Sequence, residues 1–341
     1  MLRAAVVGVG NMGKHHARVY NDLEDVELVG VADKDQKKIE NFSNHYKVPV
    51  YSSYEELFNK EKPDLVSVVV PTNLHHRVAI EAIKRGIHVL VEKPIALNRY
   101  EAEDLVSKAN SKNITLGVGH VERFNPALIE LKRRLQAGEL GEIFLVHSRR
   151  QSPFPKYIKD VGVVMDLASH EVDILRYIIG KDPKSIYSRT IRRLHDIHED
   201  ALFSILSFEN GISAMLDVNW LTPTKIRELR VTGQKGMFVV DYIAQDLYFY
   251  ENSFRPDQWE TLAIFRGIDE GNVTKIWVKK EEPLKLEILN FINSVYENKT
   301  PIVSGRDGLH ALILSELILK SGDESRVINL SEEPIERIEL S

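Results

Sequence analysis

The chain has 341 residues, of which 43% are hydrophobic and 28% charged, so it can build about two globular domains and carries no compositional sign of disorder. Its 50 acidic and 45 basic residues give a net charge of -5, which disfavours binding to a nucleic-acid backbone. The absence of cysteine excludes disulfides, thiolate nucleophiles and cysteine metal sites.

No apolar run approaches the roughly 20 residues of a membrane span. The residues Met1-Leu2-Arg3 lead straight into a strand pattern and do not resemble a signal peptide. We therefore expect a cytoplasmic protein with no membrane partner.

Short apolar runs alternate with amphipathic segments through the first 120 residues. These runs predict buried parallel strands at 2–7, 26–32, 65–70, 87–91 and 114–118. Strands separated by helices predict a doubly wound sheet, in which ligands bind beyond the carboxyl ends of the strands. The loops after these strands are therefore the first place to look for functional residues.

A glycine motif follows the first strand directly and opens a helix. It reads Gly8-Val9-Gly10-Asn11-Met12-Gly13. Gly8 permits a tight turn, Gly10 lets a pyrophosphate approach the backbone, and Gly13 allows the helix to pack on the strand. The helix start offers amides and a positive dipole to phosphates. This context predicts a Rossmann dinucleotide-binding domain, with Gly8, Gly10, Asn11, Met12 and Gly13 as cofactor-binding residues.

The second strand ends at Asp33, where a carboxylate can bind the adenosine ribose and repel a 2'-phosphate. This favours NAD over NADP. Lys34 follows and partly offsets the repulsion, so NADP stays open as an alternative. Asp33 is also a good turn or helix-capping residue, and the two roles are compatible.

Two further strands end in chemically useful residues. Thr72 and His75 follow one strand, with His75 and His76 at the start of a helix, and Glu92-Lys93-Pro94 follows the other. We expect Thr72, His75 and Glu92 to contact the cofactor. Because proline disfavours helix at the residue before it, Lys93 should be extended and point into the cleft rather than lie on the surface.

The pattern changes near His120, which predicts domains at 1–120 and 121–341. Helices are expected at about 125–135, 164–179, 284–296 and 306–320, and strands at 143–149, 201–208, 212–220, 228–231 and 237–241. Asn210-Gly211 predicts a hairpin. The second domain is therefore predicted to be α/β with a large, mainly antiparallel sheet. Covering its free face favours a homo-oligomer.

Asp166 and His170 lie four residues apart at the start of the predicted helix 164–179. This spacing suits a carboxylate that orients an imidazole acting as general base, although an ordinary helical Asp/His pair has the same spacing. The run from His195 to Asp200 contains possible metal ligands, but it lies in a predicted turn and hydride transfer needs no metal, so we expect no metal site.

Taken in order, the glycine motif, Glu92-Lys93-Pro94 and the Asp166, His170 and Asp173 pattern resemble the Gfo/Idh/MocA oxidoreductases over nearly the whole chain. The resemblance implies a Rossmann domain followed by an antiparallel-sheet domain used in oligomerisation, giving a homodimer or homotetramer. It also implies that Lys93, Asp166 and His170 are catalytic and contact the substrate.

The segment from Gly119 to Ala127 is similar to that of the UDP-N-acetylglucosamine 3-dehydrogenases within the family. The resemblance implies a sugar-nucleotide substrate, in which Arg123 and Asn125 could bind phosphate or sugar oxygens. Asn125 and Pro126 also read as an ordinary helix start.

The resulting hypothesis is NAD-dependent oxidation of a secondary hydroxyl, with His170 taking the proton and Lys93 stabilising the oxygen. The sequence leaves open which of Lys93 and His170 is the base. Two alternatives remain: another sugar or polyol dehydrogenase, acting on a UDP-sugar uronic acid or an inositol, and a non-catalytic binder that senses NAD or sugars.

Overall fold

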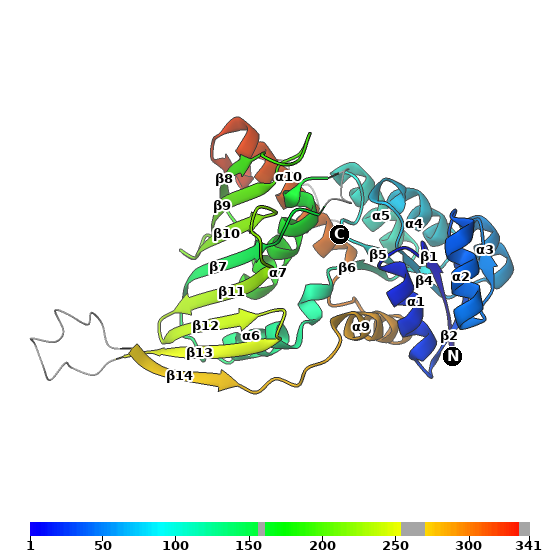
Figure 1. Ribbon diagram of the computed structural model, residues 1–341, viewed down its shortest axis with the longest axis horizontal. Coiled ribbons are helices and arrows are strands. Elements are labelled where there is room, and N and C mark those ends of the chain that lie inside the picture. The colour runs from blue at the N-terminus through cyan, green and yellow to red at the C-terminus, as the bar shows by residue number, and fades with distance from the viewer. Residues whose placement is uncertain (156–160, 254–269, 334–341) are drawn as a thin grey trace, which may run out of the picture. The chain divides into compact units, whose positions relative to one another are not determined.

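The computed structural model describes residues 1–155, 161–253 and 270–333 (Figure 1). Contacts divide these residues into two compact units. The first unit comprises Met1–Phe124 and Glu282–Ile313, and the second comprises Asn125–Glu281 together with residues 314–333. Within the described residues, no helix is both long enough and apolar enough to span a bilayer.

The first unit is a parallel sheet with the strand order β3-β2-β1-β4-β5-β6. Its strands are β1 (Leu2–Val7), β2 (Val26–Ala32), β3 (Val50–Tyr51), β4 (Leu65–Val68), β5 (His88–Glu92) and β6 (Leu116–Gly119). Its helices are α1 (Gly13–Asp22), α2 (Gln36–Tyr46), α3 (Tyr54–Glu61), α4 (His75–Lys84), α5 (Arg99–Ser111), α9 (Pro283–Glu297) and the first part of α10 (Gly305–Glu324), with 3-10 turns η1 (Thr72–Leu74) and η2 (Val121–Phe124). This is the order of a dinucleotide-binding sheet, as the sequence predicts.

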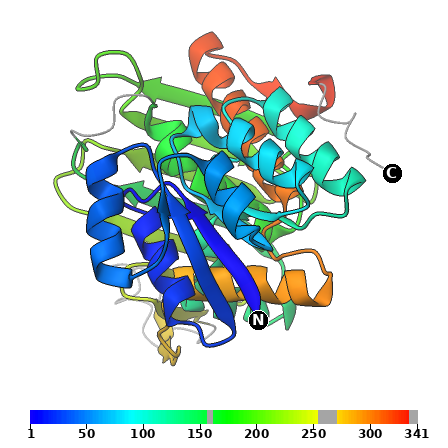
Figure 2. The same ribbon diagram turned by 90° about the vertical axis from the view of Figure 1, so that its right-hand side faces the viewer.

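Helix α9 belongs to the first unit although it follows the second in the chain. Figures 1 and 2 show α9, in orange, beside α1. Its residues Leu284, Ile288 and Phe291 are buried in the core that also holds Ala17 and Tyr20 of α1. In the structure the first unit ends at Phe124 and also includes residues 282–313, which follow the second unit in the chain. The division at residue 120 stays a prediction.

The second unit is built on a nine-stranded sheet with the order β14-β13-β12-β11-β7-β10-β9-β8-β15. Its strands are β7 (Ile143–Gln151), β8 (Ser185–Ile191), β9 (Ala201–Ser207), β10 (Ser213–Asn219), β11 (Ile226–Gly233), β12 (Gly236–Asp241), β13 (Asp246–Asn252), β14 (Glu270–Ile276) and β15 (Ile328–Asn329). Its helical segments are α6 (Pro126–Gln136), the π-helical turn η3 (Val164–Ala168), α7 (Ser169–Ile179), the rest of α10 and the 3-10 turn η4 (Leu330–Glu332).

This sheet is mainly antiparallel, as predicted, and only the β7–β10 pair is parallel among its described pairs. The predicted hairpin joins β9 to β10, with Gly211 at a positive φ of 82°. Helices α6 and α7 pack on the sheet (Figure 1). Alternate side chains of β8 to β10 point away from the buried face, and several of these are large and apolar.

Candidate functional site

The glycine loop between β1 and α1 has the geometry that the motif predicts. Gly8 has a φ of 94°, and a Cβ atom there would overlap the carbonyl oxygen of Val69. A Cβ atom on Gly13 would overlap the carbonyl oxygen of Gly8, so α1 packs tightly against the loop. At Gly10, by contrast, no heavy atom lies within 4 Å of the added carbon. The backbone is therefore open to a ligand at Gly10 alone of the three.

The start of α1 is prepared for an anion. Exposed Met12 occupies the N-cap position and makes no side-chain capping bond, and the first turn contains no acidic residue. The exposed Asn11 lies in the same loop. An uncapped helix start with its positive dipole can bind the phosphates of a dinucleotide.

Asp33 fixes this loop from the end of β2. Its Oδ2 accepts a hydrogen bond from the Val9 amide at 2.9 Å, and its Oδ1 accepts one from the Asp35 amide at 2.9 Å. The predicted turn role of Asp33 is thus confirmed, whereas helix α2 is capped by Asp35. Since each carboxylate oxygen has a second acceptor position, Asp33 can still bind a ribose hydroxyl.

A cavity of about 530 Å³ extends from the glycine loop along the carboxyl ends of β1, β2 and β4. Gly8, Gly10, Asp33, Lys34, Tyr54 and Arg77 are among the residues that line it. The Arg77 Nε donates to the Tyr54 hydroxyl at 3.2 Å. Sequence reasoning missed Tyr54 and Arg77, because each lies within an ordinary helix and belongs to no motif.

The Glu92-Lys93-Pro94 turn closes the end of β5. The Lys93–Pro94 peptide bond is cis, and Lys93 is half-buried. His75 lies beneath this turn with 1% of its surface exposed. Its Nδ1 lies 2.8 Å from the carbonyl oxygen of Pro94, and its Nε2 lies 2.8 Å from that of Val70. Burial lowers the pKa of His75 more than these two carbonyls raise it.

These contacts make His75 a brace between two strand ends. Thr72 is half-buried in η1, just before His75. Both ring nitrogens of His75 already contact backbone carbonyl oxygens of the protein. The cofactor contacts predicted for Thr72, His75 and Glu92 stay predictions.

Arg123 and Asn125 are both buried and hydrogen-bonded. The Arg123 guanidinium donates to the Ile302 carbonyl at 3.0 Å and to the Asp307 carboxylate at 3.1 Å. The Asn125 side chain caps α6 by accepting from the Ala127 amide at 3.2 Å, which confirms the helix-start interpretation. The predicted substrate contacts of these two residues stay predictions.

In the second unit, Asp166 lies in the π-helical turn η3, and His170 lies in the first turn of α7. The predicted helix over 164–179 is therefore present, but its first five residues are π-helical, so the spacing of an α-helix does not apply between Asp166 and His170. Both side chains are half-buried. π-helical turns within longer helices are frequent at functional sites.

Glu199 fixes the start of this turn. Its Oε1 accepts from the Val164 amide at 2.9 Å, and its main-chain carbonyl accepts from the Val163 amide at 3.0 Å. Gly162 makes room for the Glu199 carboxylate, which any Cβ atom at this position would overlap. Asp200, fully buried, accepts from the amides of residues 193, 194 and 195.

The run His195 to Asp200, considered as possible metal ligands, thus uses two of its three carboxylates, those of Glu199 and Asp200, as acceptors of backbone amides. The His195 Nδ1 also accepts from backbone amides, those of Ile197 and His198. Among the described residues, no three His, Asp or Glu side chains are arranged to hold a metal ion.

Glu171, next to His170, anchors α7 to the sheet. It is fully buried and accepts hydrogen bonds from Ser148 and Arg150 of β7 and, at 3.2 Å, from the hydroxyl of Tyr242. The Arg150 guanidinium also lies over the Tyr242 ring. A buried ion pair with all of these partners fixes the start of the helix that carries His170.

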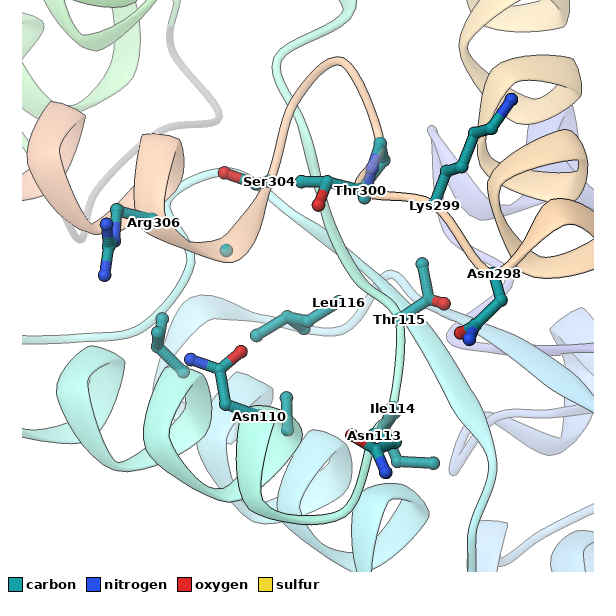
Figure 3. A pocket seen from close by; sticks show the side chains of 14 residues that line it. Asn110, Asn113, Ile114, Thr115, Leu116, Asn298, Lys299, Thr300, Ser304 and Arg306 are labelled. Atoms are coloured by element: carbon teal, nitrogen blue, oxygen red, sulfur yellow. The ribbon is translucent and has the colours of Figure 1, made fainter. Parts of the chain in front are cut away.

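A second cavity, of about 430 Å³, lies beside the amino end of β6, which is an edge strand of the first unit's sheet (Figure 3). Asn110, Thr115, Leu116, Thr300 and Ser304 are among its lining residues. Thr115 and Leu116 stand at the amino end of β6, whereas ligands of doubly wound sheets bind beyond the carboxyl ends. We therefore place the candidate cofactor site at the glycine loop.

Comparison with known proteins gives the same assignment. Residues 2–120 match the oxidoreductase family with an NAD-binding Rossmann fold, Gfo/Idh/MocA, and residues 128–239 match the Gfo/Idh/MocA C-terminal domain. The chain belongs to the Gfo/Idh/MocA family. It is accordingly an NAD-binding oxidoreductase, and the glycine loop, Asp33 and the adjoining cavity fit that cofactor.

Individual relatives within the Gfo/Idh/MocA family differ in substrate. The chain is 27% identical to UDP-N-acetylglucosamine 3-dehydrogenase of Acidithiobacillus ferrooxidans, over 91% of this chain and 94% of the relative. A solved structure of that enzyme superposes with a TM-score of 0.83 at 26% identity, covering 95% and 98% of the two chains. The chain is 25% identical to myo-inositol 2-dehydrogenase of Thermotoga maritima, over 97% and 99%.

Proposed function

We propose that this chain oxidises a secondary hydroxyl of a sugar nucleotide with NAD, and that UDP-N-acetylglucosamine, converted to its 3-keto form, is the foremost substrate. The observation that carries this proposal is the likeness to UDP-N-acetylglucosamine 3-dehydrogenase along nearly the full length of both chains, in sequence and in fold. Lys93, Asp166 and His170, which the family resemblance makes catalytic, are all present.

We assign each catalytic candidate one role. His170 takes the proton of the substrate hydroxyl, and Asp166 orients or charges the imidazole. Lys93 stabilises the negative charge that develops on the same oxygen. NAD, when bound, accepts the hydride from the carbinol carbon. Product formed in this way would serve a later step of glycan assembly.

A second candidate function is oxidation of an inositol. It is favoured by the 25% identity to myo-inositol 2-dehydrogenase over almost the whole chain. A non-catalytic sensor of NAD or sugars is less favoured, because a sensor has no need of an acid/base pair.

We further propose that the chain forms a homodimer or homotetramer through the free face of its large sheet. Tyr187, Phe203, Ile205 and Met215 expose 44%, 46%, 51% and 44% of their surfaces on this face. The strand register places Tyr187 opposite Ile205 and Ile205 opposite Met215, which makes a continuous apolar row. Such a row would pack well against a second copy.

The substrate proposal is tested by following NADH formation with NAD or NADP. Separate reactions would contain UDP-N-acetylglucosamine, its uronic acid, myo-inositol or free glucose, each with and without 2-oxoglutarate. Turnover of UDP-N-acetylglucosamine, at a kcat/KM at least about tenfold above the others, is expected. Turnover of myo-inositol alone would replace the proposal by the second candidate, and NADH binding without turnover of any substrate would favour a sensor.

A further inference from the structure

A line of buried polar side chains connects α1 to the Glu92-Lys93 turn. The His16 imidazole is fully buried; its Nδ1 lies 3.1 Å from the Ser67 hydroxyl and its Nε2 lies 3.0 Å from Glu92 Oε1. The Tyr20 hydroxyl, also buried, lies 2.9 Å from the same Ser67 oxygen. The line therefore starts at Tyr20, about two turns inside α1, passes through Ser67 of β4, returns to His16 of α1 and ends on the carboxylate before Lys93.

One assignment of hydrogens satisfies every group in this line. Tyr20 donates to Ser67, Ser67 donates to His16 Nδ1, and His16 donates from Nε2 to the Glu92 carboxylate. Burial raises the pKa of Tyr20, which keeps its hydroxyl protonated as the first donor. In this assignment all donors point the same way, and the Nε2 hydrogen of His16 is directed at the Glu92 carboxylate.

The absence of a side chain at Gly119 leaves room for the Glu92 carboxylate. Gly119 of β6 lies opposite Glu92 in the strand register, and a Cβ atom there would come within 3.0 Å of the carboxylate. Glu92 Oε2 accepts from the Lys93 amide at 3.2 Å. Besides His16, Lys93, which follows Glu92, and His75 of α4 also interact electrostatically with Glu92.

We propose that His16 is a positioning residue, which holds the Glu92 carboxylate in its ionised form and, through it, the backbone that carries Lys93. The effect on catalysis rests on the function proposed above, whereas the effect on Glu92 does not. His16 belongs to the helix that the cofactor motif opens, so the same helix start that would hold NAD also fixes the turn that carries Lys93.

The pKa of Glu92 follows from this arrangement. Burial raises it, but the interactions with His16 and Lys93 together lower it by more, so the net pKa lies below its ordinary value of 4.5. A lowered folded-state pKa stabilises the protein above the unfolded-state value, and this contribution disappears as the pH falls through the folded-state value. Without His16, burial and Lys93 would remain while the hydrogen bond that lowers the pKa would be lost, so the pKa should rise and ionised Glu92 should stabilise the protein less at neutral pH.

The first test compares His16→Leu with His15→Leu, a matched control on the exposed side of the same helix. Urea unfolding is measured at pH 4 and pH 6, with Glu92 and with Glu92→Gln. We expect His16→Leu to lower the midpoint of unfolding more at pH 6 than at pH 4, and this difference should be clearly smaller in the Glu92→Gln background, where only the titration of His16 itself remains. An equal shift at both pH values, or a difference of the same size in Glu92→Gln, would overturn the proposal.

The second test measures catalysis and cofactor binding separately. With the substrate that the wild type oxidises, kcat of His16→Leu should fall on the order of 100-fold, since small displacements of a catalytic group have effects of this size. The dissociation constant of NADH should change less than about threefold. His16→Gln, which keeps a donor toward Glu92, should recover part of kcat.

A kcat for His16→Leu equal to that of His15→Leu would remove the catalytic part of the proposal. Should His16→Leu fail to fold, Ser67→Ala takes its place, because it removes the partner that His16 Nδ1 shares with the Tyr20 hydroxyl but keeps the imidazole, and it should change unfolding and kcat in the same directions. Absence of turnover in the wild type would refute the proposed function, and the unfolding experiment would still decide the role of His16.

Discussion

Lys93 is the residue on which the proposed chemistry depends most. It follows a buried strand, and its backbone is held by Glu92 and by the neighbouring His75 brace. Lys93→Met should lower kcat by about 100-fold or more while NADH binding stays unchanged, because the side chain serves the reacting oxygen and not the dinucleotide. Steady-state kinetics and NADH fluorescence titration provide the two measurements.

The exposed Lys84 of α4 offers the control Lys84→Met, which should leave both quantities unchanged.

The variant His170→Asn tests whether His170 or Lys93 is the base that takes the proton. If His170 takes the proton, its loss should remove the limb of the pH profile near neutral pH, and a retained limb would transfer that role to Lys93.

At the scale of the element, we expect alanine substitutions at Gly10 and Gly13, at the two ends of the turn that leads from β1 into α1, to have different effects. Gly10→Ala should leave the unfolding free energy within about 0.5 kcal/mol, since the added carbon meets no atom of the protein, yet weaken NADH binding because it occupies the space expected for the pyrophosphate. Gly13→Ala should cost about 1–3 kcal/mol, because its added carbon overlaps the Gly8 carbonyl.

Urea unfolding and NADH titration of both variants separate these effects. Equal destabilisation by the two substitutions, or unchanged NADH affinity in Gly10→Ala, would contradict the assignment of the loop.

The attachment of α7 to β7 depends on a buried ion pair. Arg150 exposes 2% of its surface and Glu171 none, so Arg150→Met leaves a buried carboxylate without its cation. Loss of about 3–5 kcal/mol of unfolding free energy is expected for this change. The double variant Arg150→Met with Glu171→Leu should be markedly more stable than Arg150→Met alone. If the two were equally unstable, the charge would not be the cause.

At the scale of the whole molecule, the free face of the nine-stranded sheet exposes the apolar row that contains Ile205 and Met215. Ile205→Lys with Met215→Lys places two charges in its apolar row and should lower the molecular mass measured by light scattering, because a buried interface cannot accommodate them unpaired. Ile129→Lys on α6, at a comparably exposed position, is the control. A mass unchanged by the double substitution would exclude this face as the interface.

Most of the first unit could be predicted from local patterns. The apolar runs place β1 and β2 at their observed bounds, and the glycine motif locates the start of α1, because these signals depend on side chains close together in the chain. The second sheet was predicted less completely. Strand β13, for example, shows no regular alternation of buried and exposed residues, so periodicity could not find it.

The sequence by itself determined the family resemblance, the two kinds of sheet and the glycine loop, and it indicated Lys93, Asp166 and His170 as candidate catalytic residues. Tertiary structure decided which unit α9 joins, the π-helical turn at Asp166, and the partners of His16, Glu171 and Glu199. His16 meets Ser67 and Glu92 across 51 and 76 residues of chain. Contacts over such separations leave no periodic signal, since they are set by how strands and helices pack and not by the local chain.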